Sequence, residues 1–417
     1  MKSTDSRPLA ILSAPGSRGD VNPMIAVGRE LKAIGYDVAI SLAAPYTAIA
    51  QAAGLDPYAL IDQEQFDQVM ADPAVWKPVR GMAKVLRGVA AHFLLPHFDL
   101  IRSLHRPGRT VLVSHPLDFA SRVYRDLDPS TPLVDVHLSP VMLRTPSEPA
   151  RLTPWRLEPT ANRYTFSLAY WLGDAVVLDR LLGGSINRLR RSHGLPAIRR
   201  ILDHWWLSPD RVLAMYPAWF APATQTLLPQ LRHVGFPLDD GSDLPVAAPA
   251  NRPIVFTGGT ANQHSREFFT RAANVCHDLG RAGLLLSGHP ECFPKSLPAG
   301  VQTLGYVPLG KLLPECSAIV HHGGVGTTSQ SLRCGIPQVV RPMAFDQFDN
   351  AARVERLGCG IWLRKDRELA NALERVLGDP NFAVSAGQVA QRFGGPAAAR
   401  LAASEVDAVR TVRTAPV

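Results

Sequence analysis

The sequence predicts an α/β protein with two Rossmann-like domains, each a parallel sheet covered by helices. The length of 417 residues exceeds one ordinary hydrophobic core, so two domains of roughly 200 residues each are expected. Both halves contain short apolar runs that lead into Gly-rich turns and helical patterns, at 8–34 and 318–334. The stretch at 238–252 is rich in Pro, Ala, Asp and Gly, the composition of an interdomain linker.

The N-terminal domain, expected at 1–237, begins with a βαβ unit. Pro8 to Ala14 is a short apolar run typical of a buried parallel strand. A Gly-rich turn to Asp20 follows, and Pro23 to Ile34 carries apolar residues at helical spacing. Gly35 ends this helix before a second strand at 37–42. The remaining expectations are strands at 110–114 and 133–138, an apolar helical region at 75–104, a Pro-rich loop at 145–160, and a segment at 180–202 with six arginines and no acid.

The C-terminal domain, expected at 253–390, repeats the pattern. A strand at 253–256 ends at the turn Thr257-Gly258-Gly259-Thr260, and a helix is expected at 264–280. Further strands are expected at 283–287, 301–306, 318–321 and 338–341, with a helix at 328–334. The chain after about 365 is helical in pattern, and its last part, 391–417, forms a helical tail.

The net charge of +8 and the isoelectric point of about 9.4 favour anionic partners. A nucleotide diphosphate and an anionic membrane surface are candidates, and an ordinary solvated surface is an equal alternative. The sequence has no zinc-finger spacing, aromatic–basic motif or basic tail, so nucleic acid is not expected.

The five cysteines lie singly, without a Cys-x-x-Cys pair, so neither a disulfide framework nor a metal site is expected. The N-terminal apolar run is too short for a secretory signal, and the longest uncharged run is interrupted by Pro45 and Gly54. A cytoplasmic protein is expected, with loose association at the inner membrane as an option.

The segment from His322 to Thr328 is the strongest local signal for ligand binding. It joins a predicted strand to a predicted helix, and its glycines let backbone amides approach a phosphate group. The start of the helix adds donors and a favourable dipole, and Thr327 and Thr328 add hydroxyls. Because no Lys follows the glycines, the segment is not a P-loop. From the glycines alone, a tight turn without a ligand is an open alternative.

Two carboxylates lie near the predicted turns. Asp346, beside Gln347, could hold the vicinal hydroxyls of a sugar at the carboxyl edge of a sheet. Asp20 could take a proton from an acceptor hydroxyl. Each carboxylate has a helix cap as its alternative role. A core or surface role is favoured for three other polar residues near predicted strand ends: His115, Asp118 and His137.

Two motifs carry a resemblance to a known family. Gly-Asp-Val-Asn-Pro stands at 19–23, and HHGGVGTTSQSLRCGIPQVVRPMAFDQFDNAARVERLGCGIWL runs from His321 to Leu363. In this order they resemble the bacterial UDP-glycosyltransferase family of inverting GT-B enzymes, and the resemblance extends over essentially the whole chain. Three further segments are similar to the rhamnosyltransferases of rhamnolipid biosynthesis: MADPAVWKP at 70–78, LSPDRVLAMYPAWFAP at 207–222 and HVGFPLDDGS at 233–242.

The resemblance implies the GT-B fold, in which two Rossmann-like domains face each other across a cleft and the C-terminal tail could pack back on the first domain. It implies Asp20 as the general base. It also implies a donor site in the second domain: the diphosphate at His322, Gly324, Gly326, Thr327, Thr328, Gly259 and Thr260, the sugar at Asp346 and Gln347, and the nucleobase at Tyr306 and Val307.

The activity that the resemblance implies is an inverting hexosyl transfer, with L-rhamnose moved from dTDP-L-rhamnose to the hydroxyl of a 3-(3-hydroxyalkanoyloxy)alkanoate. The expected partners are a dTDP- or UDP-sugar, a lipid-like acceptor and a protein that makes this acceptor; no metal or other cofactor is expected. One alternative is transfer of another sugar to a polyketide, carotenoid or other hydrophobic alcohol. The others are a sugar-nucleotide 2-epimerase and a non-catalytic sugar-nucleotide binding protein.

Overall fold

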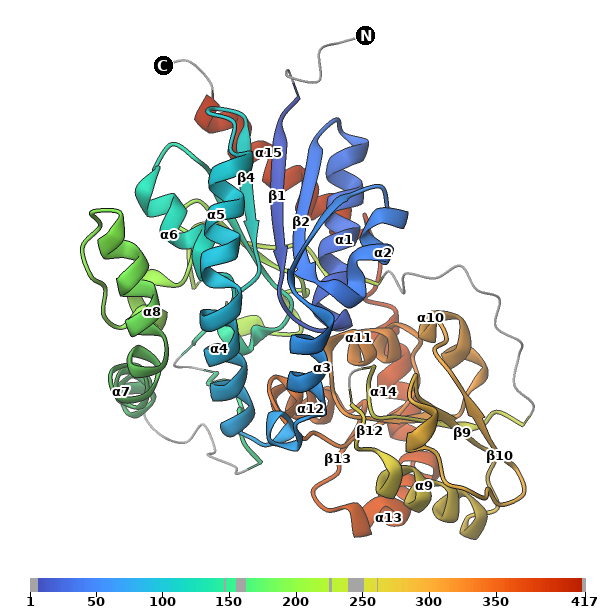
Figure 1. Cartoon of the computed structure of the whole chain (residues 1–417). Helices are drawn as coiled ribbons and strands as arrows, with labels where there is room; N and C mark the ends of the chain where they lie inside the picture. The colour runs from blue at the N-terminus through green and yellow to red at the C-terminus, as the bar shows by residue number, and fades with distance from the viewer. Residues whose placement is uncertain are drawn as a thin grey trace.

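The computed structural model describes residues 7–145, 148–154, 163–224, 227–238, 251–260 and 262–414. Two parallel sheets with helices on their faces form two domains (Figure 1). The predicted α/β class with two Rossmann-like domains is confirmed. The predicted linker at 238–252 falls mostly outside the described residues, and so does half of the predicted loop at 145–160.

The first sheet has seven strands in the order β3-β2-β1-β4-β5-β6-β7, and every neighbouring pair is parallel. Its strands are β1 (Leu9–Ala14), β2 (Asp37–Ala43), β3 (Asp56–Ile61), β4 (Thr110–Ser114), β5 (Leu133–His137), β6 (Arg211–Ala214) and β7 (Leu231–His233). Its helices are α1 (Arg18–Ala33), α2 (Thr47–Ala52), α3 (Gln63–Ala71), η3 (Pro73–Trp76), α4 (Arg80–His92), α5 (Leu94–Leu104), α6 (Phe119–Leu127), α7 (Arg163–Gly173), η5 (Asp174–Leu178) and α8 (Asp179–Ser192).

The second sheet has six strands in the order β10-β9-β8-β11-β12-β13, again all parallel. They are β8 (Ile254–Thr257), β9 (Gly283–Leu286), β10 (Val301–Leu304), β11 (Ala318–His321), β12 (Gln338–Val340) and β13 (Gly360–Trp362). Its helices are α9 (Arg266–Asp278), α10 (Leu309–Leu312), α11 (Val325–Arg333), α12 (Gln347–Arg356), α13 (Leu369–Gly378) and α14 (Pro380–Ala390). The chain then continues into α15 (Ala398–Thr414).

The strand order of each sheet fixes where a ligand can bind. In an open parallel sheet the crevice lies beyond the carboxyl ends of the strands, where the order reverses. That point lies between β1 and β4 in the first sheet and between β8 and β11 in the second. The segments that follow these four strands therefore meet in pairs; they carry His115, Gly259 and His322 in loops and Asp20 in the first turn of α1.

The C-terminal helix α15 belongs to the core of the first domain. Ala402 and Val406 are fully buried in one cluster with β1, β2 and α1. The Tyr36 hydroxyl donates to Asp407 Oδ1 at 2.6 Å and accepts from Arg410 Nε at 2.7 Å. In Figure 1 this red helix lies among the blue elements of the N-terminus. The end of the chain thus crosses from the second domain back to the first.

An apolar interface joins the two domains. Phe220 and Phe236 of the first domain are buried in one cluster with Phe348 and Trp362 of the second. Arg353 of α12 lies in this interface, where its guanidinium donates to the backbone oxygen of Phe220 at 2.8 Å. Helix α12, a part of the second domain, is therefore fixed against the first.

Two helices begin earlier than their apolar periodicity predicts. α1 begins at Arg18 instead of Pro23, because Asp20 caps it by accepting hydrogen bonds from the backbone N–H of Ser17 at 2.8 Å and from the Ser17 hydroxyl at 3.2 Å. α11 begins at Val325 instead of residue 328. Both glycine turns thus pass into a helix within a few residues, which turns the helix N-termini toward the cleft. The sequence does not predict strands β3, β6, β7 and β13.

Candidate functional site

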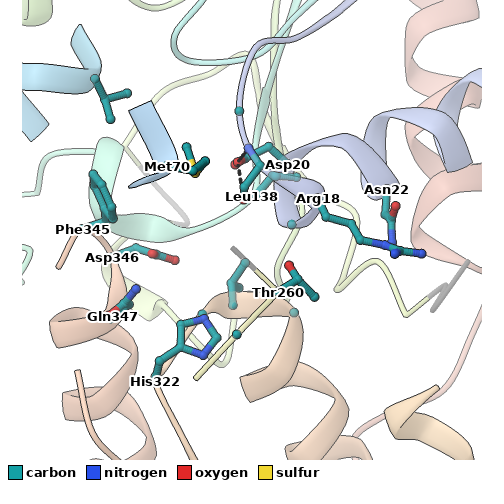
Figure 2. Close-up of a pocket in the computed structure, with 18 of the residues that line it drawn as sticks. Arg18, Asp20, Asn22, Met70, Leu138, Thr260, His322, Phe345, Asp346 and Gln347 are labelled. Atoms are coloured by element: carbon teal, nitrogen blue, oxygen red, sulfur yellow. Dashed lines mark hydrogen bonds between the residues drawn. The ribbon is translucent and has the colours of Figure 1, made fainter. Parts of the chain in front are cut away.

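A cavity of about 550 Å³ lies between the two domains, with walls from both switch points. Figure 2 shows Asp20 on one wall and His322, Asp346 and Gln347 on the facing wall. The cavity is lined by eleven of the twelve residues predicted for the site: Asp20, Gly259, Thr260, Tyr306, Val307, His322, Gly324, Gly326, Thr327, Asp346 and Gln347. Side chains from both ends of the chain thus meet around one space.

Asp20 is held firmly at the start of α1. One carboxylate oxygen accepts the two hydrogen bonds of Ser17, and the other lies 3.2 Å from His115 Nε2. Gly16 makes room for it, since a Cβ at that position would lie 2.1 Å from Asp20 Oδ2. Burial raises the pKa of Asp20, but the hydrogen bond and charge of His115 and the donors of Ser17 outweigh it, so the pKa lies below its ordinary value. Asp20 is therefore ionised at neutral pH and can accept a proton.

His115 directs its proton toward Asp20. Its Nδ1 accepts a hydrogen bond from the backbone N–H of Leu117 at 3.2 Å, so the ring proton that faces Asp20 is the one on Nε2. The backbone N–H of His115 donates to Ser13 Oγ at 3.0 Å. The sequence predicts a core or surface role for His115. The structure shows that its buried ring also forms part of the cavity wall.

The ring of His322 lies between two glycines. A Cβ on Gly259 would lie 2.7 Å from His322 Cε1, and a Cβ on Gly324 would lie 2.4 Å from His322 Nε2. Burial lowers the pKa of His322 to about 4, so the ring is neutral at pH 7. Gly259 and Gly324 are therefore needed to leave room for the His322 ring, whether or not a ligand is bound. Gly326, by contrast, has open space where its Cβ would be, at the first turn of α11.

Asp346 is the N-cap residue of α12 and is tied to the glycine turn. The amide nitrogen of Asn350 donates to Asp346 Oδ2 at 2.9 Å and to the backbone oxygen of Gly323 at 2.8 Å. Burial, with a smaller contribution from the negative charge of Asp20, raises the pKa of Asp346 to about 7 against the hydrogen bond from Asn350. The two carboxylates thus influence one another across the cleft.

Gln347 presents its amide nitrogen to a ligand. Its side-chain oxygen accepts hydrogen bonds from the backbone N–H groups of Met343 at 2.8 Å and Ala344 at 3.1 Å. These two bonds fix the amide orientation, which leaves the NH₂ group as a donor at the cavity wall.

The predicted nucleobase segment at Tyr306 and Val307 lines the same cavity. The Arg18 guanidinium of the first domain lies over the Tyr306 ring, 4.1 Å from its centroid. A planar cation stacked on an aromatic face is a stabilising contact. This end of the cavity is therefore formed by both domains, a feature that the sequence does not predict.

The prediction for Thr328 is not supported. Thr328 is fully buried and does not line the cavity. Because α11 begins at Val325, Thr328 lies in its second turn with its side chain turned into the protein, whereas Gly326 and Thr327 stay at the cavity wall.

An apolar chamber extends from Asp20 into the first domain. Its lining comes mainly from α3, η3 and α4, with the side chains of Phe66, Val69, Met70, Val75, Trp76, Met82, Val85 and Val89. The second domain contributes Phe345, whose ring meets Trp76 edge-on at 6.4 Å between centroids. Phe345 has a φ of 57°, a strained conformation for a bulky residue that recurs at functional sites.

The other polar residues near strand ends lie outside the cavity. Asp118 is buried and lies 3.1 Å from His97 Nε2, and His137 is fully buried. The five cysteines are free thiols. Within the described residues, no three His, Cys, Asp or Glu side chains gather in a way that could hold a metal ion. Nor does the described part of the chain contain a helix that is both long and apolar enough to cross a bilayer.

Comparison with known proteins finds similarity to glycosyltransferases. Residues 289–407 match the family described as erythromycin biosynthesis protein CIII-like, C-terminal domain. A glycosyltransferase of Mycobacterium tuberculosis is 28% identical over 97% of this chain and 99% of its own length. The O-mycaminosyltylonolide 6-deoxyallosyltransferase of Streptomyces fradiae is 28% identical over 89% of this chain and 90% of its own length.

Solved structures show the same fold. The calicheamicin glycosyltransferase CalG4 covers 98% of this chain and all of its own, with a TM-score of 0.71 at 17% identity. The spinosyn rhamnosyltransferase SpnG covers 96% of this chain and 99% of its own, with a TM-score of 0.64 at 20% identity. The architecture is therefore the GT-B fold that the resemblance implies.

Proposed function

We propose that the protein is an inverting glycosyltransferase that moves a sugar from a dTDP- or UDP-sugar to the hydroxyl of a hydrophobic acceptor. The observation that carries the proposal is the pair formed by Asp20 and His115 on the wall opposite His322. Inversion needs the attacking hydroxyl and the departing diphosphate on opposite sides of the anomeric carbon. A base on one wall and a diphosphate site on the other meet that need.

In the proposed reaction, the acceptor oxygen bonds to the anomeric carbon while the bond from that carbon to the diphosphate oxygen breaks. Asp20 accepts the hydroxyl proton, and the Nε2–H of His115 keeps its carboxylate in position. The diphosphate leaves with the electron pair. The backbone amides at the start of α11 and the His322 ring would stabilise its charge, the contribution that is usually largest in such a step.

The sugar would lie between Asp346 and Gln347. The carboxylate of Asp346 can accept from sugar hydroxyls, and the fixed amide of Gln347 can donate to them. Asn350 keeps Asp346 in register with the diphosphate turn through Gly323. Sugar and diphosphate would thus be held by one connected unit of the second domain.

The more specific form of the proposal is transfer of L-rhamnose from dTDP-L-rhamnose to a 3-(3-hydroxyalkanoyloxy)alkanoate. The sequence resemblance to rhamnolipid enzymes supports it, and the apolar chamber suits an aliphatic acceptor. The competing acceptor is a polyketide-type alcohol, which the names of relatives such as the 6-deoxyallosyltransferase favour. A protein that makes the acceptor remains a proposed partner for the rhamnolipid form.

The decisive test of the transferase proposal is Asp20→Asn in purified protein. Loss of the base should lower the transfer rate by about 10²–10⁴-fold, whereas binding of dTDP should persist. A rate within about tenfold of the wild type would exclude Asp20 as the base. Incubation with the donor alone separates the alternative classes, because an epimerase would convert it without an acceptor.

The donor and acceptor are separated by a crossed panel. dTDP-L-rhamnose and UDP-glucose are each offered with a hydroxyalkanoyloxyalkanoate and with a polyketide aglycone. The proposal of rhamnolipid synthesis requires product from dTDP-L-rhamnose with the hydroxyalkanoyloxyalkanoate. Product from the aglycone alone would retain the transferase and reject the lipid acceptor.

A further inference from the structure

The segment formed by α7 and η5 has an unusual polarity. Five large apolar side chains along it are between 44% and 57% exposed: Leu168, Trp171, Leu172, Val176 and Val177. A surface helix of a soluble protein normally turns its polar face outward. Single exposed apolar residues are ordinary, but a contiguous group marks an interaction site. We call these five residues the outer apolar patch.

The inner side of the same segment is fixed by the buried Phe166 and by a specific ion pair. Asp174 is fully buried and pairs with Arg144 at 2.7 Å. The Arg144 guanidinium also lies 4.9 Å from the centroid of the Tyr170 ring. Because this ion pair holds the inner side, the exposure of the outer apolar patch is a built feature of the segment and does not reflect loose packing.

Positive charge lies beside the outer apolar patch at Arg180 and Arg199 and continues along α8. Along α8 and the segment after it, four arginines are exposed: Arg180, Arg188, Arg191 and Arg199. The nearby carboxylate of Asp179 is already used, since it accepts from the backbone N–H groups of Arg200 and Ile201 at 2.6 and 3.0 Å. A shallow pocket joins patch and arginines, with Trp171, Arg180 and Arg199 in its wall. α7 and α8 lie on the outer side of the first domain, away from the second (Figure 1).

We propose that the outer apolar patch docks on the surface of an anionic lipid bilayer. Its apolar side chains would enter the boundary between headgroups and acyl chains, and the arginines would contact lipid phosphates. Trp171, apolar in its ring and polar at its N–H, suits that depth. A second copy of the chain fits less well, because a twofold dimer through the patch would bring the arginine borders of both copies together.

Vesicle flotation tests the proposal on the full-length protein. The wild type should bind vesicles that contain phosphatidylglycerol, bind phosphatidylcholine vesicles more weakly, and release from the anionic vesicles as salt rises. Trp171→Ser and Leu168→Ser should each weaken binding about tenfold or more, as expected for the loss of one buried large apolar side chain. Arg188→Gln and Arg191→Gln should each weaken it about fivefold on anionic vesicles only.

Ile34→Ser is the matched control, because Ile34 is 53% exposed on the first domain outside the patch; its binding should equal that of the wild type. All variants should keep the wild-type unfolding midpoint, and they should transfer sugar to a dispersed acceptor at the wild-type rate. A loss of vesicle binding can then be distinguished from a loss of the proposed transferase activity. Absence of wild-type binding to anionic vesicles would overturn the proposal. So would patch variants that bind vesicles normally but dissociate a dimer or a complex with another protein.

Discussion

Asp20 Oδ1 and His115 Nε2 lie 3.2 Å apart although 95 positions separate the two residues in the sequence. They meet because β1 and β4 are parallel neighbours, so the turn after β1 and the loop after β4 leave the sheet at the same edge. The backbone N–H of Leu117 donates to Nδ1 of His115, so Nε2–H is the group that donates to the Asp20 carboxylate. His115 is thus a positioning residue for the proposed base, with consequences for the pH dependence of the reaction.

Removal of His115 should shift the acid limb of kcat/KM. His115 helps to hold the pKa of Asp20 below its ordinary value, and activity requires the ionised carboxylate. In His115→Ala, burial would dominate and the pKa would rise, so activity should fall at a higher pH than in the wild type. The measurement is the pH profile of kcat/KM. His115→Gln, whose amide can donate in place of Nε2–H, should restore part of the shift, and identical profiles for all three proteins would refute the role of His115.

The sequence predicts this site only in part, and the reason is physical. Nine of the strands are predicted, most of them from apolar runs, because both faces of a parallel sheet are buried. β3 is largely half-buried and β7 buries only one of its three residues, so these two runs carry no such signal. The pairing of Asp20 with His115 depends on the order of strands, which periodicity does not contain. The sequence does show that both residues follow predicted strands, but it does not show that these two strands are neighbours in the sheet.

Two glycines of the proposed diphosphate turn, Gly324 and Gly326, should differ in their response to a methyl group. In Gly324→Ala the new Cβ would strike the His322 ring, so both stability and dTDP affinity should fall. In Gly326→Ala the Cβ meets nothing within 4 Å, and the position lies in a helix, so stability should hold or rise slightly. Its dTDP affinity should nevertheless fall if the diphosphate occupies that open space. Calorimetric titration with dTDP, beside thermal unfolding, gives both quantities; unchanged affinity in Gly326→Ala would move the diphosphate away from α11.

Asp346→Asn should become relatively more stable as pH rises. Burial raises the pKa of Asp346 from 3.8 to about 7, so the folded protein retains a proton that the unfolded chain releases. This contribution is fully present below the unfolded pKa and is lost as pH rises through the folded one. The variant has no such loss, so its stability relative to the wild type should grow between pH 4 and about 7, by about 1.4 kcal/mol per unit of pKa difference. Urea unfolding across this range measures it. Asp135, whose pKa burial also raises to about 7, is present in both proteins and cancels; a difference that is independent of pH would contradict the buried titration.

Removal of the buried Arg353 should strongly lower the free energy of unfolding, because its side chain joins α12 to the first domain. Its guanidinium donates to Asp349 Oδ2 at 2.6 Å and to Glu148 Oε1 at 2.9 Å, and both Arg353 and Asp349 are buried. Arg353→Met leaves two carboxylates without this partner, which should lower the free energy of unfolding by about 3–5 kcal/mol. Arg271→Met is the matched control, since Arg271 pairs with Glu267 one turn away on the surface of α9, at 3.8 Å, where such a pair contributes about 0–1 kcal/mol.

The same substitution, Arg353→Met, tests whether the interface positions the proposed sugar site at Asp346 and Gln347. α12 carries Gln347 at its first turn and Asp346 as its cap, so a loosened α12 should raise the donor KM even where the protein stays folded. Asp349→Leu added to Arg353→Met should recover part of the stability, because it removes the uncompensated buried charge. It should not recover the KM in full, because the bonds of Arg353 to Glu148 and to the Phe220 backbone oxygen are still missing, although Arg356 keeps its own contact with Glu148. Urea unfolding and donor kinetics on the single and double variants separate the two effects. Recovery of both quantities together would show that Arg353 acts on the site through stability alone.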